Sequence, residues 1–174
     1  MIGTALGVLP VIALCLFDPA PRLVWNATAS APVGLYSVTP GRLPQTGQLA
    51  LIEPARPLGL WLARRHYLPL GVPLIKRIAA TAGQTVCRTG DLVTIDGRHA
   101  ALAKAHDRAG RLMPIWTGCR MLGSEEMLLL NAAEDSLDGR YLGPLPTTGM
   151  IGTVHPVLTR ATPQGDFLWQ GVGR

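Results

Sequence analysis

The stretch PLIKRIAA, residues 73–80, is the part of this sequence that decides the fold. Apart from Lys76 and Arg77 its side chains are apolar, and a short apolar run bounded by turn residues is typical of a buried strand. Alternate residues of a strand share a face, so Lys76 lies on the same face as Leu74 and Ile78. The stretch therefore predicts a buried strand that carries a lysine among apolar neighbours.

Burial would change the chemistry of Lys76. A lysine at its solution pKa of about 10.4 is protonated at neutral pH and cannot accept a proton. Desolvation disfavours the ammonium, and lowering the pKa by about three units, or roughly 4 kcal/mol, would make the amine a general base. The alternative is an ordinary lysine that extends its head group to water, and the strand alone does not decide between the two.

A second informative stretch is NATASAPVGLY, residues 26–36, which contains Ser30. Pro32 and Gly34 restrict and bend the backbone just after this serine, which suits an exposed nucleophile with a usable backbone N–H. Thr28 lies on the same side of an extended chain, so its hydroxyl could join that N–H in an oxyanion hole. The alternative is a plain surface loop before a strand.

The rest of the chain predicts a mostly β fold in one domain. Its 174 residues fit a single core, and 20 glycines and 15 prolines interrupt it at short intervals, as in proteins of short strands and turns. One short helix is expected at 57–67. Strands are expected at 34–38, 48–53, 73–80, 127–131 and 150–154. Residues 91–102 predict a hairpin, with Asp96 and Gly97 as its type I′ turn.

Charge argues against nucleic acid as a partner. The formal net charge is +5, but the basic residues are scattered arginines and form no stripe interleaved with aromatic residues. Among them only Lys76 and Lys104 are lysines, and the chain has four serines: Ser30, Ser37, Ser124 and Ser136. Chemistry that uses serine and lysine therefore has few candidate residues.

Residues 1–17, MIGTALGVLPVIALCLF, carry no charged side chain. This length is at the lower limit for a membrane-spanning helix. We expect an uncleaved transmembrane anchor at 1–17 followed by a catalytic domain at 18–174, with a signal peptide or a buried core helix as alternatives. Cleavage after Ala29 would separate Thr28 from Ser30. Arg22 follows the apolar run, so the positive-inside rule alone would place the domain in the cytoplasm.

Three stretches together resemble a known family. The pattern T-x-S-x-P-x-G-x-Y in residues 28–36 resembles the nucleophile box of the signal peptidase I superfamily, especially of the TraF-type conjugative-transfer peptidases. PLIKRIAATAG, residues 73–83, resembles the lysine box of that family, and DSLDGRYLG, residues 135–143, resembles its third box. The three occur in the family's order and span most of the chain.

The resemblance implies a role for each matching residue. Ser30 matches the nucleophile, and Lys76 matches the general base. Thr28 matches the residue whose hydroxyl joins the Ser30 N–H in the oxyanion hole, and Ser136 matches the serine that orients the lysine.

A charged group is also implied behind the site. Asp138 and Arg140 match a charged pair that supports it, and Arg77 is expected to join them. A polar turn is the alternative interpretation of these three residues.

The chain departs from the general signal peptidases at four positions. Their lysine box usually continues with Gly, Pro and Asp, and their third box commonly has Ser. This chain has Ala80, Ala82, Gln84 and Gly139 instead. These departures favour the TraF-type branch.

The resemblance further implies a signal-peptidase-like β domain that faces the periplasm and is held to the bacterial inner membrane. This overrides the orientation expected from charge. Exposure to the periplasm makes a Cys87–Cys119 disulfide plausible, whereas in the cytosol both would be free thiols. Cys15 lies in the expected anchor. No cofactor or metal is expected, because the four histidines are dispersed and no nucleotide-binding motif is present.

The resulting hypothesis is a Ser–Lys peptidase that processes, and cyclises, a pilin precursor in conjugation or type IV secretion. The expected partners are that precursor, membrane lipid and components of the secretion system. Two rivals stay open. One is a signal peptidase-like enzyme that only hydrolyses its substrate, and the other is a non-catalytic, membrane-tethered assembly module.

Overall fold

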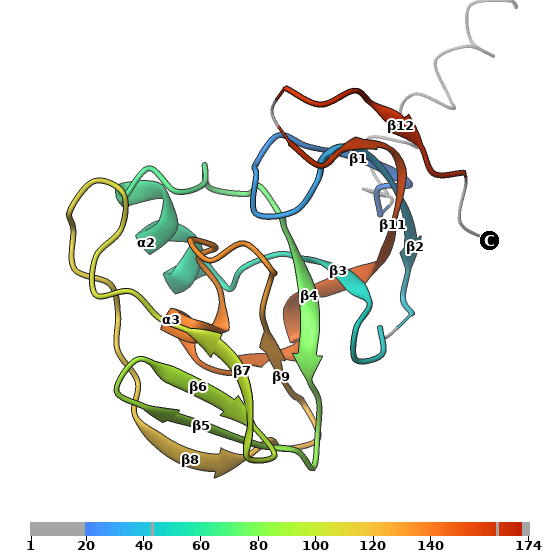
Figure 1. The fold of residues 1–174 in the computed structure, drawn as a ribbon. Helices are drawn as coiled ribbons and strands as arrows, with labels where there is room; N and C mark the ends of the chain where they lie inside the picture. The colour runs from blue at the N-terminus through green and yellow to red at the C-terminus, as the bar shows by residue number, and fades with distance from the viewer. Residues whose placement is uncertain (1–19, 43, 163, 172–174) are drawn as a thin grey trace, which may run out of the picture.

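The computed structural model describes residues 20–42, 44–162 and 164–171, and this part of the chain is built mainly from antiparallel strands. The strands form one large sheet and one four-stranded sheet, with the short helices at their margins (Figure 1). The mostly β fold predicted from the spacing of glycine and proline is therefore confirmed.

The large sheet has the strand order β1-β2-β11-β3-β4-β9-β10, and β12 pairs with β11 outside this path. Its strands are β1 (Leu23–Asn26), β2 (Val33–Pro40), β3 (Leu49–Ile52), β4 (Leu74–Ala80), β9 (Glu126–Leu129), β10 (Leu145–Pro146), β11 (Met150–Arg160) and β12 (Leu168–Trp169). The predicted lysine strand is β4, and it lies between β3 and β9. The predicted serine follows β1, which pairs with β2.

The smaller sheet has the order β7-β6-β5-β8. It consists of β5 (Thr85–Thr89), β6 (Leu92–Ile95), β7 (Arg98–Leu102) and β8 (Gly118–Met121). The hairpin of β6 and β7 turns at Asp96 and Gly97, whose φ angles of 50° and 74° are those that a type I′ turn requires. A disulfide joins Cys87 on β5 to Cys119 on β8, as the resemblance implied.

Two α-helices and one 3₁₀-helix complete the described elements. They are α2 (Arg56–Arg64), α3 (Gly139–Leu142) and the 3₁₀-helix at Thr147–Gly149. The predicted helix at 57–67 corresponds to α2, which ends earlier because His66 adopts a positive φ of 56°. In Figure 1, α2 lies on the opposite side of β4 from β1 and β12.

Three hydrophobic clusters hold β4 in place. Ile75 packs with Tyr36 and Val154, beneath the turn that carries Ser30. Ile78 packs with residues of β3 and β9, and Ala80 packs with residues of the four-stranded sheet. Because β4 contributes to all three clusters, its position is fixed along its whole length.

The strands at 34–38, 48–53, 73–80, 127–131 and 150–154 are confirmed within a few residues. The last of them, β11, is much longer than predicted and continues to Arg160 through a bulge between Pro156 and Leu158. Proline has no N–H to donate to a neighbouring strand, so a ladder that continues past Pro156 needs such an irregularity.

The predicted membrane anchor, residues 1–17, lies outside the described residues. Within the described ranges, no helix combines the length and the apolar character needed to cross a bilayer.

Candidate active site

Lys76 lies near the middle of β4 with only 3% of its surface exposed. Its ammonium Nζ donates a hydrogen bond of 2.8 Å to the hydroxyl of Ser136, and both groups are buried. The strand prediction therefore placed Lys76 correctly, and its head group does not extend to bulk water.

The surroundings of Lys76 lower its pKa from 10.5 to about 8. The largest cause is burial, which disfavours the charged ammonium. The negative charge of Asp138 acts in the opposite direction, and the positive charge of Arg140 adds to the lowering. A substantial fraction of Lys76 is thus neutral slightly above neutral pH, as a general base requires.

Ser136 is held by a buried charged pair on the adjacent turn. Asp138 is the N-cap of α3 and accepts hydrogen bonds from the backbone N–H and the guanidinium of Arg140, with an Nε–Oδ1 distance of 2.8 Å. Arg140 also donates to the carbonyls of Glu134 and Asn131, so the guanidinium closes the loop around Ser136. Asp138 and Arg140 therefore lie together behind the site.

Asn131 connects this charged pair to the lysine strand, a role that no motif around it in the sequence indicates. Its backbone N–H donates to Asp138, and its side chain accepts from the N–H of Arg77 and donates to the carbonyl of Ile75. These two β4 residues flank Lys76. Asn131 therefore ties the strand that carries the base to the loop that orients it.

The expectation that Arg77 joins the charged pair is corrected. Neighbouring residues of a strand point to opposite faces, so the Arg77 side chain leaves the face of Lys76. It is exposed, and its guanidinium donates to the carbonyl of Gly47. Only its backbone N–H takes part in the network, through Asn131.

Ser30 lies in the turn between β1 and β2 and is half-buried. Its Oγ is 3.3 Å from the hydroxyl of Thr28, and the Thr28 hydroxyl in turn donates to Oδ1 of Asn26 at 2.9 Å. Within the described residues, no hydrogen bond joins Ser30 to Lys76. Such contacts are often long in a substrate-free site and shorten when substrate binds.

The end of the Ser30 turn is fixed by Gly34 and Tyr36. Gly34 has a φ of 146°, and a Cβ at this position would lie 2.1 Å from the carbonyl oxygen of Leu158, so the close approach of β11 requires glycine. The buried Tyr36 donates its hydroxyl proton to the carbonyl of Pro32 at 2.6 Å. Burial raises the pKa of Tyr36 to about 12, so it remains a donor across the physiological range.

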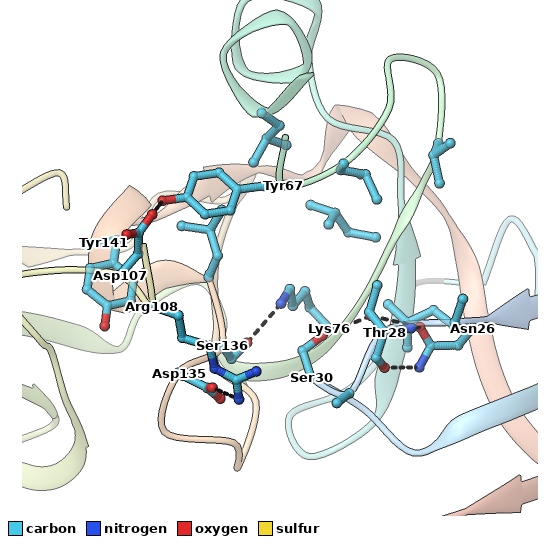
Figure 2. Close-up of a pocket in the computed structure, with 18 of the residues that line it drawn as sticks. Asn26, Thr28, Ser30, Tyr67, Lys76, Asp107, Arg108, Asp135, Ser136 and Tyr141 are labelled. Carbon is cyan, nitrogen blue, oxygen red and sulfur yellow. Dashed lines mark hydrogen bonds and ion pairs between the residues drawn. The ribbon is translucent and has the colours of Figure 1, made fainter. Parts of the chain in front are cut away.

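Ser30, Lys76 and Ser136 line one cleft of about 800 Å³, which also contacts the side chain of Thr28 (Figure 2). The three predicted residues come from the β1–β2 turn, from β4 and from the loop before α3, so the fold gathers parts of the chain that are far apart in sequence. The cleft is also lined by the apolar side chains of Leu62, Leu68, Val72, Leu74 and Met113.

The rim of the cleft also carries charges that the sequence did not indicate. Arg108 pairs with Asp135, next to Ser136, and Lys104 lies 3.5 Å from Glu134. These pairs link the loop at 104–108 to the loop that holds Ser136. Because their arginine and lysine partners are largely exposed, they contribute little to stability but can set the shape of the rim.

A second polar cluster, around Asp107, also lines the cleft. Asp107 accepts hydrogen bonds from the hydroxyl of Tyr67 and from Nε of Arg111, the latter at 2.7 Å. The hydrogen bond from Tyr67, followed by those from Arg111, holds the pKa of Asp107 well below its usual range. Asp107 therefore stays ionised, and its carboxylate holds Tyr67 and Arg111 in place.

A serine in a turn and a buried lysine that hydrogen-bonds to a second serine share this cleft, and the comparisons with known proteins identify the family of the chain. The family model described as signal peptidase, peptidase S26, matches residues 1–158. The chain belongs to the peptidase S26 family, as the three sequence boxes implied.

Within that family its relatives are conjugal transfer proteins. A probable conjugal transfer protein TraF of Sinorhizobium fredii is 36% identical over 147 residues, covering 78% of this chain and 77% of its own length. The conjugal transfer protein TraF of Agrobacterium fabrum is 34% identical over 146 residues, which are 77% of this chain and 81% of the relative. A plasmid transfer protein TraF of Escherichia coli is 32% identical over 145 residues, with the same coverage.

Among solved structures, a signal peptidase I from Enterococcus faecalis V583 aligns with 66% of this chain and 98% of its own. The TM-score is 0.39 and the sequence identity is 15%.

Proposed function

We propose that this chain is a membrane-anchored serine endopeptidase and acyl transferase that processes, and cyclises, a pilin precursor for conjugative transfer or type IV secretion. The observation that carries the proposal is the buried Lys76, whose pKa is lowered to about 8 in the cleft that also contains Ser30. A lysine in such an environment costs stability, and this cost is expected where the neutral amine is needed as a base.

In the proposed reaction, Ser30 Oγ attacks the carbonyl carbon of the scissile peptide while its proton passes to the neutral amine of Lys76. The tetrahedral intermediate then collapses, and the C–N bond breaks as Lys76 returns the proton to the leaving amine. This leaves an ester between Ser30 and the substrate. Ser136 keeps Nζ of Lys76 oriented through the hydrogen bond of 2.8 Å.

The oxyanion of the intermediate is held by the backbone N–H of Ser30 and the hydroxyl of Thr28. In the substrate-free structure the Thr28 hydroxyl donates to Asn26, so it turns toward the substrate oxygen when the intermediate forms. A donor that already lies 3.3 Å from the nucleophile needs only a rotation about one bond to do so.

The second step decides between two outcomes. Attack of water on the ester releases a linear product, as in an enzyme that only hydrolyses. Attack of the substrate's own N-terminal amine forms a new peptide bond and releases Ser30, giving a circular product that is lighter than the linear one by one water. The names of the TraF relatives favour a substrate from conjugal transfer but do not distinguish these outcomes.

Two observations support a site at the outer face of the inner membrane. First, β1 begins a few residues after the apolar segment 1–17 in the sequence, and apolar side chains on β1, on β12 and just before β12 are exposed: Leu23, Trp25, Phe167, Leu168 and Trp169. The Trp25 and Phe167 rings are 5.8 Å apart, which makes the two strands one patch, here called the aromatic patch. Tryptophan is enriched at membrane interfaces. Second, the disulfide suits an oxidising compartment such as the periplasm.

The test is mass spectrometry of a candidate pilin precursor incubated with the wild type, Ser30→Ala and Lys76→Ala. Product is expected from the wild type alone, and its mass distinguishes cyclisation from hydrolysis. Ser124→Ala, at an exposed serine, is the matched control and should keep full activity. Undiminished product from Ser30→Ala would refute the mechanism.

The rival of another class, a non-catalytic assembly module, makes a different prediction. Such a module would form no ester at Ser30 with any precursor, and Ser30→Ala would support conjugation as well as the wild type does. The lowered pKa of Lys76 is the observation against it, because a module without chemistry gains nothing from an amine that burial destabilises.

A further inference from the structure

Asn26 is the last residue of β1, and its side chain lies inside the turn that carries Ser30. The residue is 8% exposed. Its Nδ2 donates to the carbonyls of Thr28, Ala31 and Pro32 at 2.9, 3.1 and 3.0 Å. Its Oδ1 accepts from the backbone N–H of Thr28 at 3.1 Å and from the Thr28 hydroxyl at 2.9 Å. One side chain thus bonds to the turn on both sides of the serine.

The pattern uses both ends of the amide in a way that few other side chains reproduce. The NH₂ group faces three carbonyl oxygens, and the C=O group faces two donors, so the orientation of the amide is fixed by its partners. Aspartate has the same shape but lacks the donors, and leucine has a similar volume but lacks both functions. The five hydrogen bonds therefore depend on asparagine chemistry rather than on volume.

Asn26 also sets the direction of the hydrogen bonds that reach the nucleophile. The Thr28 hydroxyl has a single proton and gives it to Asn26, so its lone pairs remain for Ser30. Ser30 is consequently the donor in its 3.3 Å contact with Thr28. The chain of contacts from Ser30 through Thr28 to Asn26 is visible in Figure 2.

We propose that Asn26 is a positioning residue for the nucleophile: its amide folds residues 28–32 so that the side chain at position 30 faces Lys76 in the cleft. This inference rests on the proposed function, because it assumes that Ser30 and Lys76 react as a pair. Tyr36 anchors only the end of the turn, at Pro32, whereas Asn26 holds its middle. Without Asn26 the turn loses the contacts on both sides of Ser30.

The test uses the full chain in detergent micelles and needs no substrate. Ser30→Cys, combined with Cys15→Ala, places one reactive thiol at the nucleophile position while Cys87 and Cys119 remain in their disulfide. The rate of alkylation by iodoacetamide as a function of pH gives the pKa of this thiol. A nearby lysine ammonium favours the thiolate, so the pKa should lie below the ordinary value of about 8.5.

Adding Asn26→Leu should raise the thiol pKa by about one pH unit toward its ordinary value, because the turn no longer holds the sulfur near Lys76. Asn26→Ala is the second variant if leucine prevents folding, and it should have the same effect. Asn26→Asp is unsuitable, because its own negative charge would raise the thiol pKa. An unchanged thiol pKa in a folded Asn26 variant would overturn the inference.

Two controls separate this inference from simple destabilisation and from the proposed function. Val93→Ala opens a cavity in the core of the four-stranded sheet, away from the cleft, and should leave the thiol pKa unchanged although it lowers stability. Lys76→Met should remove the depression entirely. If Lys76→Met has no effect, the proposed Ser–Lys pair is wrong. If Lys76→Met raises the pKa and the Asn26 variants do not, the pair stands and the role of Asn26 is refuted.

Discussion

Ser136 accepts a hydrogen bond of 2.8 Å from Nζ of Lys76, across 60 positions of sequence. The contact joins the interior strand β4 of the large sheet to the loop before α3. Because Lys76 and Ser136 are both buried, the Ser136 hydroxyl takes the place of water as a partner of the ammonium.

Replacing Ser136 with alanine should lower kcat by about 10- to 100-fold, because Lys76 loses the partner that orients it. The hydrogen bond favours the charged amine, so its loss should also move the pKa of Lys76 below about 8. In the pH–rate profile, activity of Ser136→Ala would therefore begin to rise at a lower pH than activity of the wild type, and its maximum rate would be smaller. Ser37→Ala is the matched control, because the Ser37 hydroxyl is buried without a partner in the described structure. Equal losses in the two variants would contradict the orienting role.

The buried lysine should make stability depend on pH. Well below pH 8 Lys76 is protonated in both states, and the cost of burying its charge is present in full. Between pH 8 and 10.5 the unfolded chain binds more protons than the folded one, so stability rises with pH. Urea unfolding of the wild type and Lys76→Met should show the advantage of methionine shrinking by about 1 kcal/mol between pH 7 and 9. A constant difference would mean that the pKa of Lys76 is ordinary.

Gly139 should not tolerate a side chain. A Cβ there would lie 2.6 Å from Cδ1 of Leu128 and 2.8 Å from the carbonyl oxygen of Leu129, so Gly139→Ala must displace α3 from β9. We expect a loss of about 1–3 kcal/mol in the free energy of unfolding, with lower activity because α3 carries Arg140. At Gly123 the nearest atom to a Cβ is 3.4 Å away, so Gly123→Ala is the control and should be nearly neutral.

The disulfide should stabilise the four-stranded sheet without taking part in the reaction. Cys87 and Cys119 lie 32 positions apart, and opening such a loop typically costs about 2–4 kcal/mol. A reductant should therefore lower the melting temperature of the wild type while leaving activity at low temperature nearly intact. The double variant Cys87→Ala/Cys119→Ala should melt at the lower temperature with or without reductant. A reductant effect that persists in the double variant would have another cause.

The aromatic patch should contact lipid. The test uses four full-length variants, each of which keeps one of the four tryptophans. The variants are reconstituted into vesicles of phosphatidylethanolamine and phosphatidylglycerol. Brominated lipids should quench the fluorescence of Trp25 and of Trp169. Trp61 and Trp116, which are half-buried elsewhere, should be quenched far less. Equal, weak quenching at all four positions would contradict membrane contact and favour a protein partner on the patch.

The sequence predicted the strand of Lys76 and the turn of Ser30 because both signals are local. An apolar run with one lysine predicts a strand, and Pro32 with Gly34 predicts a bend. The sides of a strand follow from its period of two, and the same period places the Arg77 side chain away from the group behind Lys76. The hairpin at 91–102 was predictable for the same reason, since its turn residues are adjacent.

The supporting residues were not predictable in this way. Asn131 acts on β4 from more than 50 positions away, and nothing in its neighbours indicates which backbone groups it will meet. Tyr67 and Asp107 likewise meet only in the folded chain. Asn26 is different: an asparagine two residues before a threonine, at the start of a turn, is a known local hydrogen-bonding pattern. The position of Asn26 in the turn is therefore predictable from local sequence, unlike that of Asn131.

The two halves of the candidate site are anchored unequally. The turn of Ser30 follows β1, a four-residue strand whose one partner among the described residues is β2, whereas Lys76 lies on β4, which has a partner on each side. Gentle heating should therefore loosen the serine side while the rest of the sheet remains folded. Activity would then disappear before the protein melts and return on cooling, so a heat-inactivated sample is not necessarily a denatured one.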